Sequence, residues 1–118
     1  NTTGVLAGGR SNPDMVRDPL LRAHIEACMS EVMDAAPPIF GCPLPFASPE
    51  RILQSTERNT SSSKSSMVQD WEAGRALELD AILGNAIRIA EAHGAYMPRL
   101  QTMYALLQSA VAMRDAAT

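Results

Sequence analysis

The segment ELDAILGNAIRIAEAHG, residues 78–94, decides the fold of this chain. Its apolar residues recur every three or four positions, which is the spacing of one buried helix face. We expect that face to consist of Leu79, Ile82, Leu83, Ala86, Ile89 and Ala90. Gly94 is a typical residue for ending a helix, and His93 before it lies near the negative end of the helix dipole. We therefore expect His93 to cap the helix rather than to catalyse a reaction.

A second amphipathic helix is predicted over residues 18–36, upstream of that segment. Proline lacks an N–H donor and its ring clashes with the preceding helical turn. We therefore expect Pro37 and Pro38 to end this helix. Its apolar stripe consists of Leu21, Ile25, Cys28, Val32 and Ala36.

Two further helix starts can be recognised. Ser48 before Pro49 combines a capping hydroxyl with a proline in the first helical turn. Pro98 opens the last helix in the same way. The core face expected for this last helix is Leu100, Met103, Tyr104, Leu107 and Val111.

The polar residues 56–66 allow two interpretations. A run such as TSSSKSS is typical of a flexible linker. Apolar residues resume at Met67, Val68 and Trp71 in nearly the same helical phase. The alternative is therefore one long helix with a polar centre, and these residues alone favour neither interpretation.

The composition fits one all-α domain of four or five helices. The 118 residues are 46% hydrophobic, 4% aromatic and 19% charged, with a net charge of −3. A chain of this length buries enough surface for its own core. It contains no run of about 18 apolar residues that would span a membrane. It begins with Asn1 rather than a methionine, so we expect sequence to precede it.

Several function classes find no support in the sequence. No basic face suggests a nucleic-acid partner. Cys28 and Cys42 match no zinc or redox spacing, so we expect reduced cysteines in the cytoplasm and no metal site. His24 and His93 lack ligand partners at a suitable spacing, and the Gly8–Gly9 pair follows no strand, as a phosphate loop would.

The run SSMVQDWEAGRALELDAILGNAIRIAEAHGAYMPRLQTMYALL, residues 65–107, carries a resemblance. It contains in order SSM-x-Q-D, A-G-R, E-L-D, the glycine Gly84, a Gly-then-Pro turn and Y-x-L-L. This order resembles the C-terminal domain of the ketopantoate reductase (2-dehydropantoate 2-reductase) family, and Asn1 resembles the start of that family's N-x-x-(T/S)-A-L-x-G segment. The resemblance therefore spans essentially the whole chain. It implies a helical bundle resembling the 6-phosphogluconate dehydrogenase C-terminal-like domain.

The resemblance implies a function for residues 1–118 as one substrate-closing domain. Family members carry an upstream Rossmann domain that binds NADPH, and they reduce ketopantoate to pantoate in pantothenate and coenzyme A biosynthesis. This chain contains neither that domain nor the family's catalytic lysine, so we expect it to be inactive alone. The implied partners are a 2-keto acid substrate and the Rossmann domain, and a homodimer is compatible with the resemblance.

Five residues match functional positions of the family. Asn1 resembles the second asparagine of a Lys-x3-Asn-x3-Asn pattern that binds the substrate, and Ser66 matches a serine that contacts the substrate carboxylate. Asn12 matches a further substrate-binding asparagine if one residue is inserted here. Glu78 matches the family glutamate that positions the catalytic lysine and the cofactor ribose. Ser63 stands where many relatives have an asparagine near the cofactor.

The resemblance also bears on the polar run and on substrate identity. It favours one long helix whose hydroxyl-rich side, with Ser62, Ser63 and Ser66, faces the cleft. Ala76-Leu77 replaces the usual Pro-Thr, and Trp71 replaces an aliphatic residue that we expect to fill the core. These departures suit a paralogous reductase of another 2-keto acid. The remaining alternative is a non-catalytic helical binding or dimerisation module.

Overall fold

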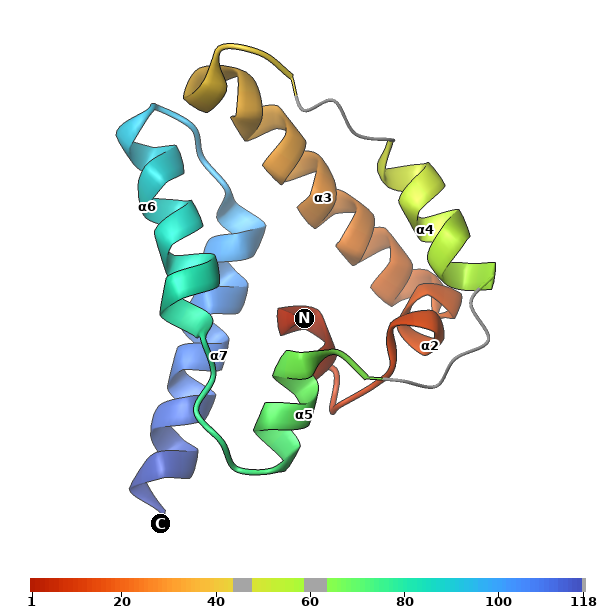
Figure 1. Cartoon of the computed structure of the whole chain (residues 1–118), viewed down its shortest axis with the longest axis vertical. Helices are drawn as coiled ribbons and strands as arrows, with labels where there is room; N and C mark the ends of the chain where they lie inside the picture. Colours follow the sequence, from red (N-terminus) through yellow and green to blue (C-terminus); the bar gives the residue numbers. More distant parts are fainter. Residues whose placement is uncertain (44–47, 59–63, 118) are drawn as a thin grey trace.

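A computed structural model describes residues 1–43, 48–58 and 64–117 of the chain (Figure 1). Within these ranges the chain forms helices and no strand, which confirms the predicted all-α fold. More helices form than the four or five expected, because short ones precede the long ones. In chain order they are α1 (Thr2–Leu6), α2 (Asn12–Arg17), α3 (Pro19–Phe40), α4 (Pro49–Arg58), α5 (Ser66–Glu72), the π-helix η1 (Asp80–Gly84), α6 (Asn85–Ala92) and α7 (Pro98–Ala116).

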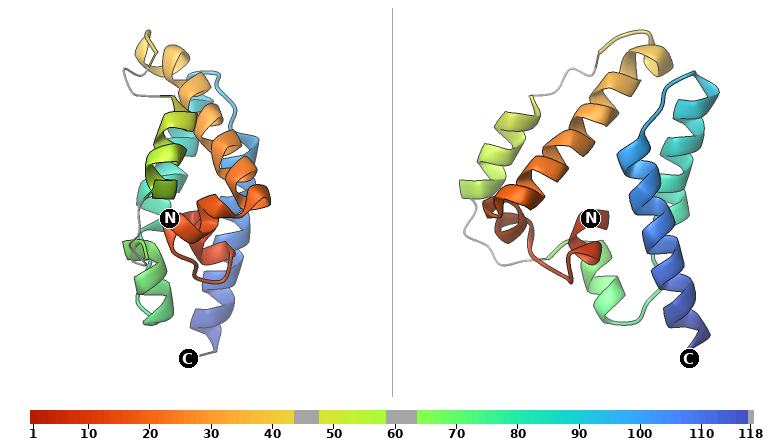
Figure 2. Two further views of the ribbon diagram at one scale, coloured as in Figure 1. Left: turned by 90° about the vertical axis from the view of Figure 1, so that its right-hand side faces the viewer. Right: turned by 180° about the vertical axis from the view of Figure 1, so that it is seen from behind.

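The long helix α3 organises the molecule, which measures 44 × 35 × 20 Å. Helices α6 and α7 pack against one part of α3, while α4 packs against α3 and α2 (Figures 1 and 2). The short helix α1 packs against both α5 and α7. The N-terminal residues of the chain therefore lie among helices that come much later in the sequence. No helix in the described ranges is long and apolar enough to span a bilayer.

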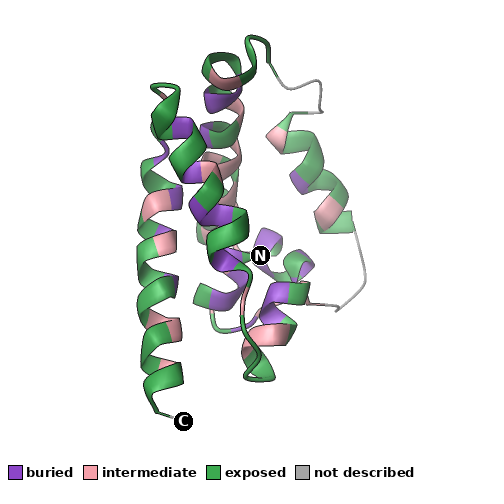
Figure 3. Ribbon diagram, turned by 60° about the vertical axis from the view of Figure 1, so that its left-hand side comes forward, coloured by how far each residue is buried: buried purple, intermediate pink, exposed green. Residues whose placement is uncertain are grey.

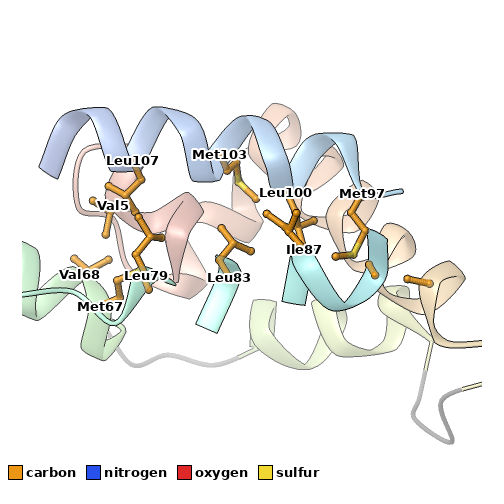
Figure 4. Close-up of a cluster of buried hydrophobic side chains, with 12 residues drawn as sticks. Val5, Met67, Val68, Leu79, Leu83, Ile87, Met97, Leu100, Met103 and Leu107 are labelled. Atoms are coloured by element: carbon orange, nitrogen blue, oxygen red, sulfur yellow. The ribbon is translucent and has the colours of Figure 1, made fainter. Parts of the chain in front are cut away.

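The main core is a single apolar cluster in which α7 faces η1 and α6. Figure 4 shows Met103 and Leu107 of α7 pointing toward the side that holds Leu79 and Leu83. Leu107 is completely buried, and α4 contributes only Leu53 to the buried set, in agreement with its largely exposed surface (Figure 3). The cluster comprises Val5, Ala35, Met67, Val68, Leu79, Leu83, Ile87, Ala90, Met97, Leu100, Met103 and Leu107.

The expectation that prolines end the second predicted helix at residue 36 is wrong. Helix α3 continues through Pro37 and Pro38 to Phe40. Gly41, with φ of 78°, ends it, and its N–H donates to the Pro37 carbonyl oxygen at 2.8 Å. The prolines lie in the last turn, where they cost the helix only two backbone hydrogen bonds. Val32, expected in the buried stripe, is 42% exposed.

Residues 78–94, predicted as one amphipathic helix, are largely helical but do not form one regular α-helix. Residues 80–84 form a π-turn, whose wider turn rotates the buried face of the residues that follow. Ile87 is therefore buried, whereas Ile82 and Ile89, both expected in the core, are 52% and 49% exposed. The end of the helix agrees with the prediction. Gly94 has φ of 77°, and His93 Nδ1 lies 2.9 Å from the Ile89 carbonyl oxygen.

The prediction of one long helix through the polar run is wrong. Ser65 has an extended backbone, and its hydroxyl accepts a hydrogen bond from the Val68 N–H at 3.4 Å. Helix α5 therefore starts afresh at Ser66. The predicted start at Ser48 is confirmed, since its hydroxyl accepts from the Arg51 N–H. Residues 59–63, which include Ser62 and Ser63, lie outside the described residues.

Candidate functional site

Asn1 and Asn12 line one cavity although ten residues separate them in the sequence. The cavity has a volume of about 160 Å³ and lies among α1, α2, α3 and α4. Asn1 is the N-cap residue of α1, and Asn12 is the first residue of α2. The Ser11 hydroxyl fixes the start of α2 by accepting from the Asp14 N–H at 3.3 Å. The remaining lining residues are Thr3, Met15, Val16, Ile25, Met29, Leu53 and Thr56.

Ser66 is exposed at the first residue of α5 and does not line that cavity. Helix α5 packs against α1, and the Thr2 hydroxyl donates to the Met67 sulfur at 3.8 Å. The residues next to Ser66 and Asn1 in sequence therefore touch each other. This contact brings the start of α5 to the start of α1, beside the cavity wall.

Glu78 lies in the connection between α5 and η1, and its side chain is exposed. Its carbonyl oxygen accepts from the Ile82 N–H at 3.1 Å. Within the described ranges, its carboxylate makes no hydrogen bond or ion pair with another residue. Glu78 does not line the cavity of Asn1 and Asn12, so that cavity does not bring all predicted site residues together. Ser63 lies outside the described residues.

A polar network next to Glu78 gives structural roles to Asp80, Gly84 and Tyr104, three residues of the family pattern. The Tyr104 hydroxyl donates to Asp80 Oδ1 at 2.5 Å, and Arg88 donates to both Asp80 oxygens at 3.1 and 3.2 Å. The Arg88 and Tyr104 hydrogen bonds lower the pKa of Asp80, and the bond to Asp80 raises the pKa of Tyr104. A Cβ atom on Gly84 would lie 2.5 Å from Asp80 Oδ1, so only glycine leaves room for the network.

Two interactions were not anticipated from the sequence. The buried Glu31 carboxylate accepts from the Arg99 N–H, with distances of 2.9 and 3.2 Å to its two oxygens. It thereby binds an unpaired donor at the start of α7. Trp71 packs against the core as expected, but Arg114 also stacks on its ring at 4.7 Å.

The expectation that His24 lacks a partner at a suitable spacing is wrong. Its Nε2 atom lies 3.5 Å from Cys28 Sγ and 3.2 Å from Met103 Sδ. The four-residue spacing of His24 and Cys28 places both on one face of α3. That spacing is a signal present in the sequence. No group of three or more His, Cys, Asp or Glu side chains arranged for a metal occurs in the described part of the chain.

The glycine pair Gly8–Gly9 does not fit the phosphates of a dinucleotide. Gly8 and Gly9 have positive φ angles but follow the short helix α1 instead of a strand. A Cβ atom on Gly9 would lie 3.1 Å from the Glu72 carboxylate, so an anion there would meet a negative charge.

Two reductases are among the solved structures that are similar to this chain. The crystal structure of 2-dehydropantoate 2-reductase from Methylococcus capsulatus is 31% identical, with a TM-score of 0.84 over 96% of this chain. A dimeric ketopantoate reductase from Staphylococcus aureus is 22% identical, with a TM-score of 0.79 over 96% of this chain. This chain covers 38% and 39% of those structures, respectively. Its fold is that of one helical domain of such reductases.

The sequence comparisons assign the chain to a family. A curated protein of Saccharomyces cerevisiae, "Uncharacterized protein YDL144C", is 50% identical over 44 residues, which are 37% of this chain and 12% of that protein. The model of the family "Ketopantoate reductase PanE/ApbA C terminal" matches residues 1–111. The chain therefore belongs to the ketopantoate reductase family and corresponds to the C-terminal domain of that family.

Proposed function

We propose that this chain is the substrate-closing domain of an NADPH-dependent 2-keto acid reductase. The proposed reaction is the reduction of ketopantoate to pantoate on the cytoplasmic route to pantothenate and coenzyme A. The observation that carries this proposal is the shared cavity of Asn1 and Asn12. Asn1 matches a substrate-binding position of the family pattern, and Asn12 matches a further one if one residue is inserted in this chain.

The cavity suits a small branched acid in size and in chemistry. Its volume of about 160 Å³ is below the 300–1,000 Å³ typical of sites for drug-sized ligands. Apolar side chains such as Val16 and Ile25 form part of its wall and suit the hydrocarbon part of a substrate. Asparagine amides can donate to a carboxylate or to a keto oxygen. Neutral donors of this kind stabilise the negative charge that develops on oxygen as the carbonyl is reduced.

Ser66 and Glu78 receive complementary roles in the proposal. The exposed Ser66 hydroxyl donates to the substrate carboxylate when the two domains close. The Glu78 carboxylate, which binds no other described residue, is available to hold the ammonium group of a lysine supplied by the upstream domain. A carboxylate beside an ammonium favours the charged forms of both groups. NADPH, bound by that upstream domain, supplies the hydride.

The test is NADPH oxidation by the whole protein that carries this chain. Ketopantoate is compared with a panel of other 2-keto acids. We expect Asn12→Ala to raise KM for the keto acid about 10- to 100-fold, since a lost hydrogen bond to a charged group costs about 1.5–3 kcal/mol. Asn12→Asp should raise KM further, because it adds a charge that repels the substrate. An unchanged KM in both variants would remove Asn12 from the site.

The role of Glu78 is tested separately by Glu78→Ala. We expect kcat to fall while the far-UV circular dichroism and the unfolding midpoint stay unchanged. Glu50 is likewise an exposed glutamate, but it lies on α4. Glu50→Ala is therefore the matched control and should retain parent activity. Parent activity in Glu78→Ala would refute the assigned role. Turnover of another keto acid alone would indicate a paralogous reductase with the same mechanism.

One observation favours a second candidate, a helical dimerisation module. An apolar groove between α3 and α6 is lined by side chains that include Val32, Phe40 and Ile89. Phe40 is 67% exposed and Ile89 49% exposed. In this case Phe40→Glu should convert a dimer into a monomer in sedimentation experiments. An unchanged sedimentation coefficient would count against the module.

A further inference from the structure

Two sulfur-bearing side chains and one imidazole, all able to bind a metal, converge between α3 and α7. His24 and Cys28 come from successive turns of α3, and Met103 comes from α7. His24 Nε2 lies 3.5 Å from Cys28 Sγ and 3.2 Å from Met103 Sδ. Cys28 and Met103 also line a common cavity, so the two sulfur-bearing side chains border the same space.

The separations are close to those of donor atoms around one metal ion. Bonds from a transition metal to sulfur and nitrogen are about 2.3 and 2.0–2.1 Å long, which places donors around a three-coordinate ion about 3.5–4 Å apart. The pair of His24 and Cys28 meets this spacing, and the pair of His24 and Met103 is a few tenths of an ångström closer. Small rotations of flexible side chains therefore suffice to admit an ion. Met103 is the most adaptable of the three, since methionine has three rotatable side-chain bonds.

A neighbouring hydroxyl orients one donor atom, and an open cavity gives an ion access to the three side chains. The Thr3 hydroxyl donates to Met103 Sδ at 3.3 Å and so orients the thioether. His24 and Met103 line an open apolar cavity of about 570 Å³. Burial, together with the charge of Glu31, raises the pKa of the Cys28 thiol to about 11, although Arg99 opposes this shift. The free thiol is thus protonated at neutral pH and is a poor nucleophile.

We propose that His24, Cys28 and Met103 form a three-coordinate site for a soft monovalent cation, Cu(I). One thiolate, one thioether and one imidazole are a donor set that favours Cu(I) over hard cations such as Mg²⁺. Binding forms one Cu–S bond to Cys28 and releases the thiol proton to solvent. It also forms dative bonds from Met103 Sδ and His24 Nε2. Copper enters and stays as Cu(I), so no electron is transferred.

The test is a competition for Cu(I) between the reduced full chain and the chromophoric chelator bathocuproine disulfonate, without oxygen. We expect one equivalent of Cu(I) per chain. Changing a residue that only supports a ligand costs 10- to 100-fold in affinity, so removing the thiolate with Cys28→Ser should cost at least about 100-fold. Met103→Leu and His24→Gln should each weaken binding about 10-fold or more.

Matched control variants separate this site from scattered thiol and thioether binding. Each changes the same residue type at an exposed position and should retain the parent affinity. The controls are Cys42→Ser, Met113→Leu and His93→Gln. Parent affinity in Cys28→Ser, or a loss of affinity in Cys42→Ser equal to that in Cys28→Ser, would overturn the proposal.

A second measurement is independent of variant folding. X-ray absorption at the copper edge of the loaded parent should show two sulfur neighbours and one nitrogen neighbour. Coordination by oxygen and nitrogen alone, or a site bridged between two chains, would refute the assigned ligands. Far-UV circular dichroism of each variant establishes that a lost affinity reflects a lost ligand. A variant with altered helix content is replaced by Cys28→Ala or Met103→Ile, for which we expect the same losses.

Discussion

Replacing Gly84 with alanine sets two opposite energetic effects against each other. Alanine is favoured over glycine inside a helix by about 1 kcal/mol. The new Cβ, however, would lie 2.5 Å from Asp80 Oδ1 and 2.9 Å from the Tyr104 hydroxyl oxygen. Overpacking of this kind costs about 1–3 kcal/mol and here also disrupts the network of Asp80, Arg88 and Tyr104. We therefore expect Gly84→Ala to lower the free energy of unfolding by about 1–2 kcal/mol.

Thermal unfolding followed by circular dichroism measures this loss. For a chain of this length the entropy of unfolding is about 0.25 kcal/mol/K, so the midpoint should fall by about 4–8 °C. The control is a double-mutant cycle with Tyr104→Phe, which removes the atom that the new Cβ approaches at 2.9 Å. In that background the cost of Gly84→Ala should shrink. A single variant about 1 kcal/mol more stable than the parent would refute the reasoning, because helix propensity alone would then decide the outcome.

Three further predictions concern charged and thiol groups. Glu31→Gln should lower the free energy of unfolding, measured by urea denaturation, by roughly 1–2 kcal/mol, because the buried carboxylate accepts a hydrogen bond from the Arg99 N–H. An unchanged urea midpoint would contradict this. Hydrogen bonds from two N–H groups of α3 lower the pKa of Asp18 below its ordinary value of 3.8. The ionised carboxylate therefore stabilises the fold at any pH above 3.8, and this stabilisation is lost as the pH falls through the lowered pKa. The stability difference between parent and Asp18→Asn should accordingly vanish below that pH, and a constant difference would be evidence against it. Cys42, which is exposed, should react with a disulfide reagent at pH 7 before Cys28, whose pKa is raised to about 11; equal rates would show that burial does not protect Cys28.

Sequence patterns predicted those parts of the fold that depend on neighbouring residues. The cap at Ser48, the helix start at Pro98 and the stop at Gly94 are confirmed, because each depends on the backbone of one turn. The π-turn was missed because it accompanies a contact between Asp80 and Tyr104, 24 residues apart. The tolerance of α3 for Pro37 was missed because Gly41, four residues later, supplies the actual helix end.

The candidate site was accessible from the sequence only in part. A family pattern singled out Asn1 and Asn12, but no periodicity could indicate that they share a cavity formed by four helices. The pair of His24 and Cys28 was visible as a four-residue spacing, whereas Met103 joins it from 75 residues further along the chain. Long-range partners of this kind require the packed structure.

The packing of α1 has a consequence for the order of folding. Three of its residues, Thr2, Gly4 and Val5, are buried. Helix α1 packs on surfaces provided by α5 and α7, and the contact of Thr3 with Met103 spans 100 residues. Closing so long a loop is slow. We expect α1, and with it Asn1, to gain protection against amide exchange during refolding only after α5 and α7 have packed.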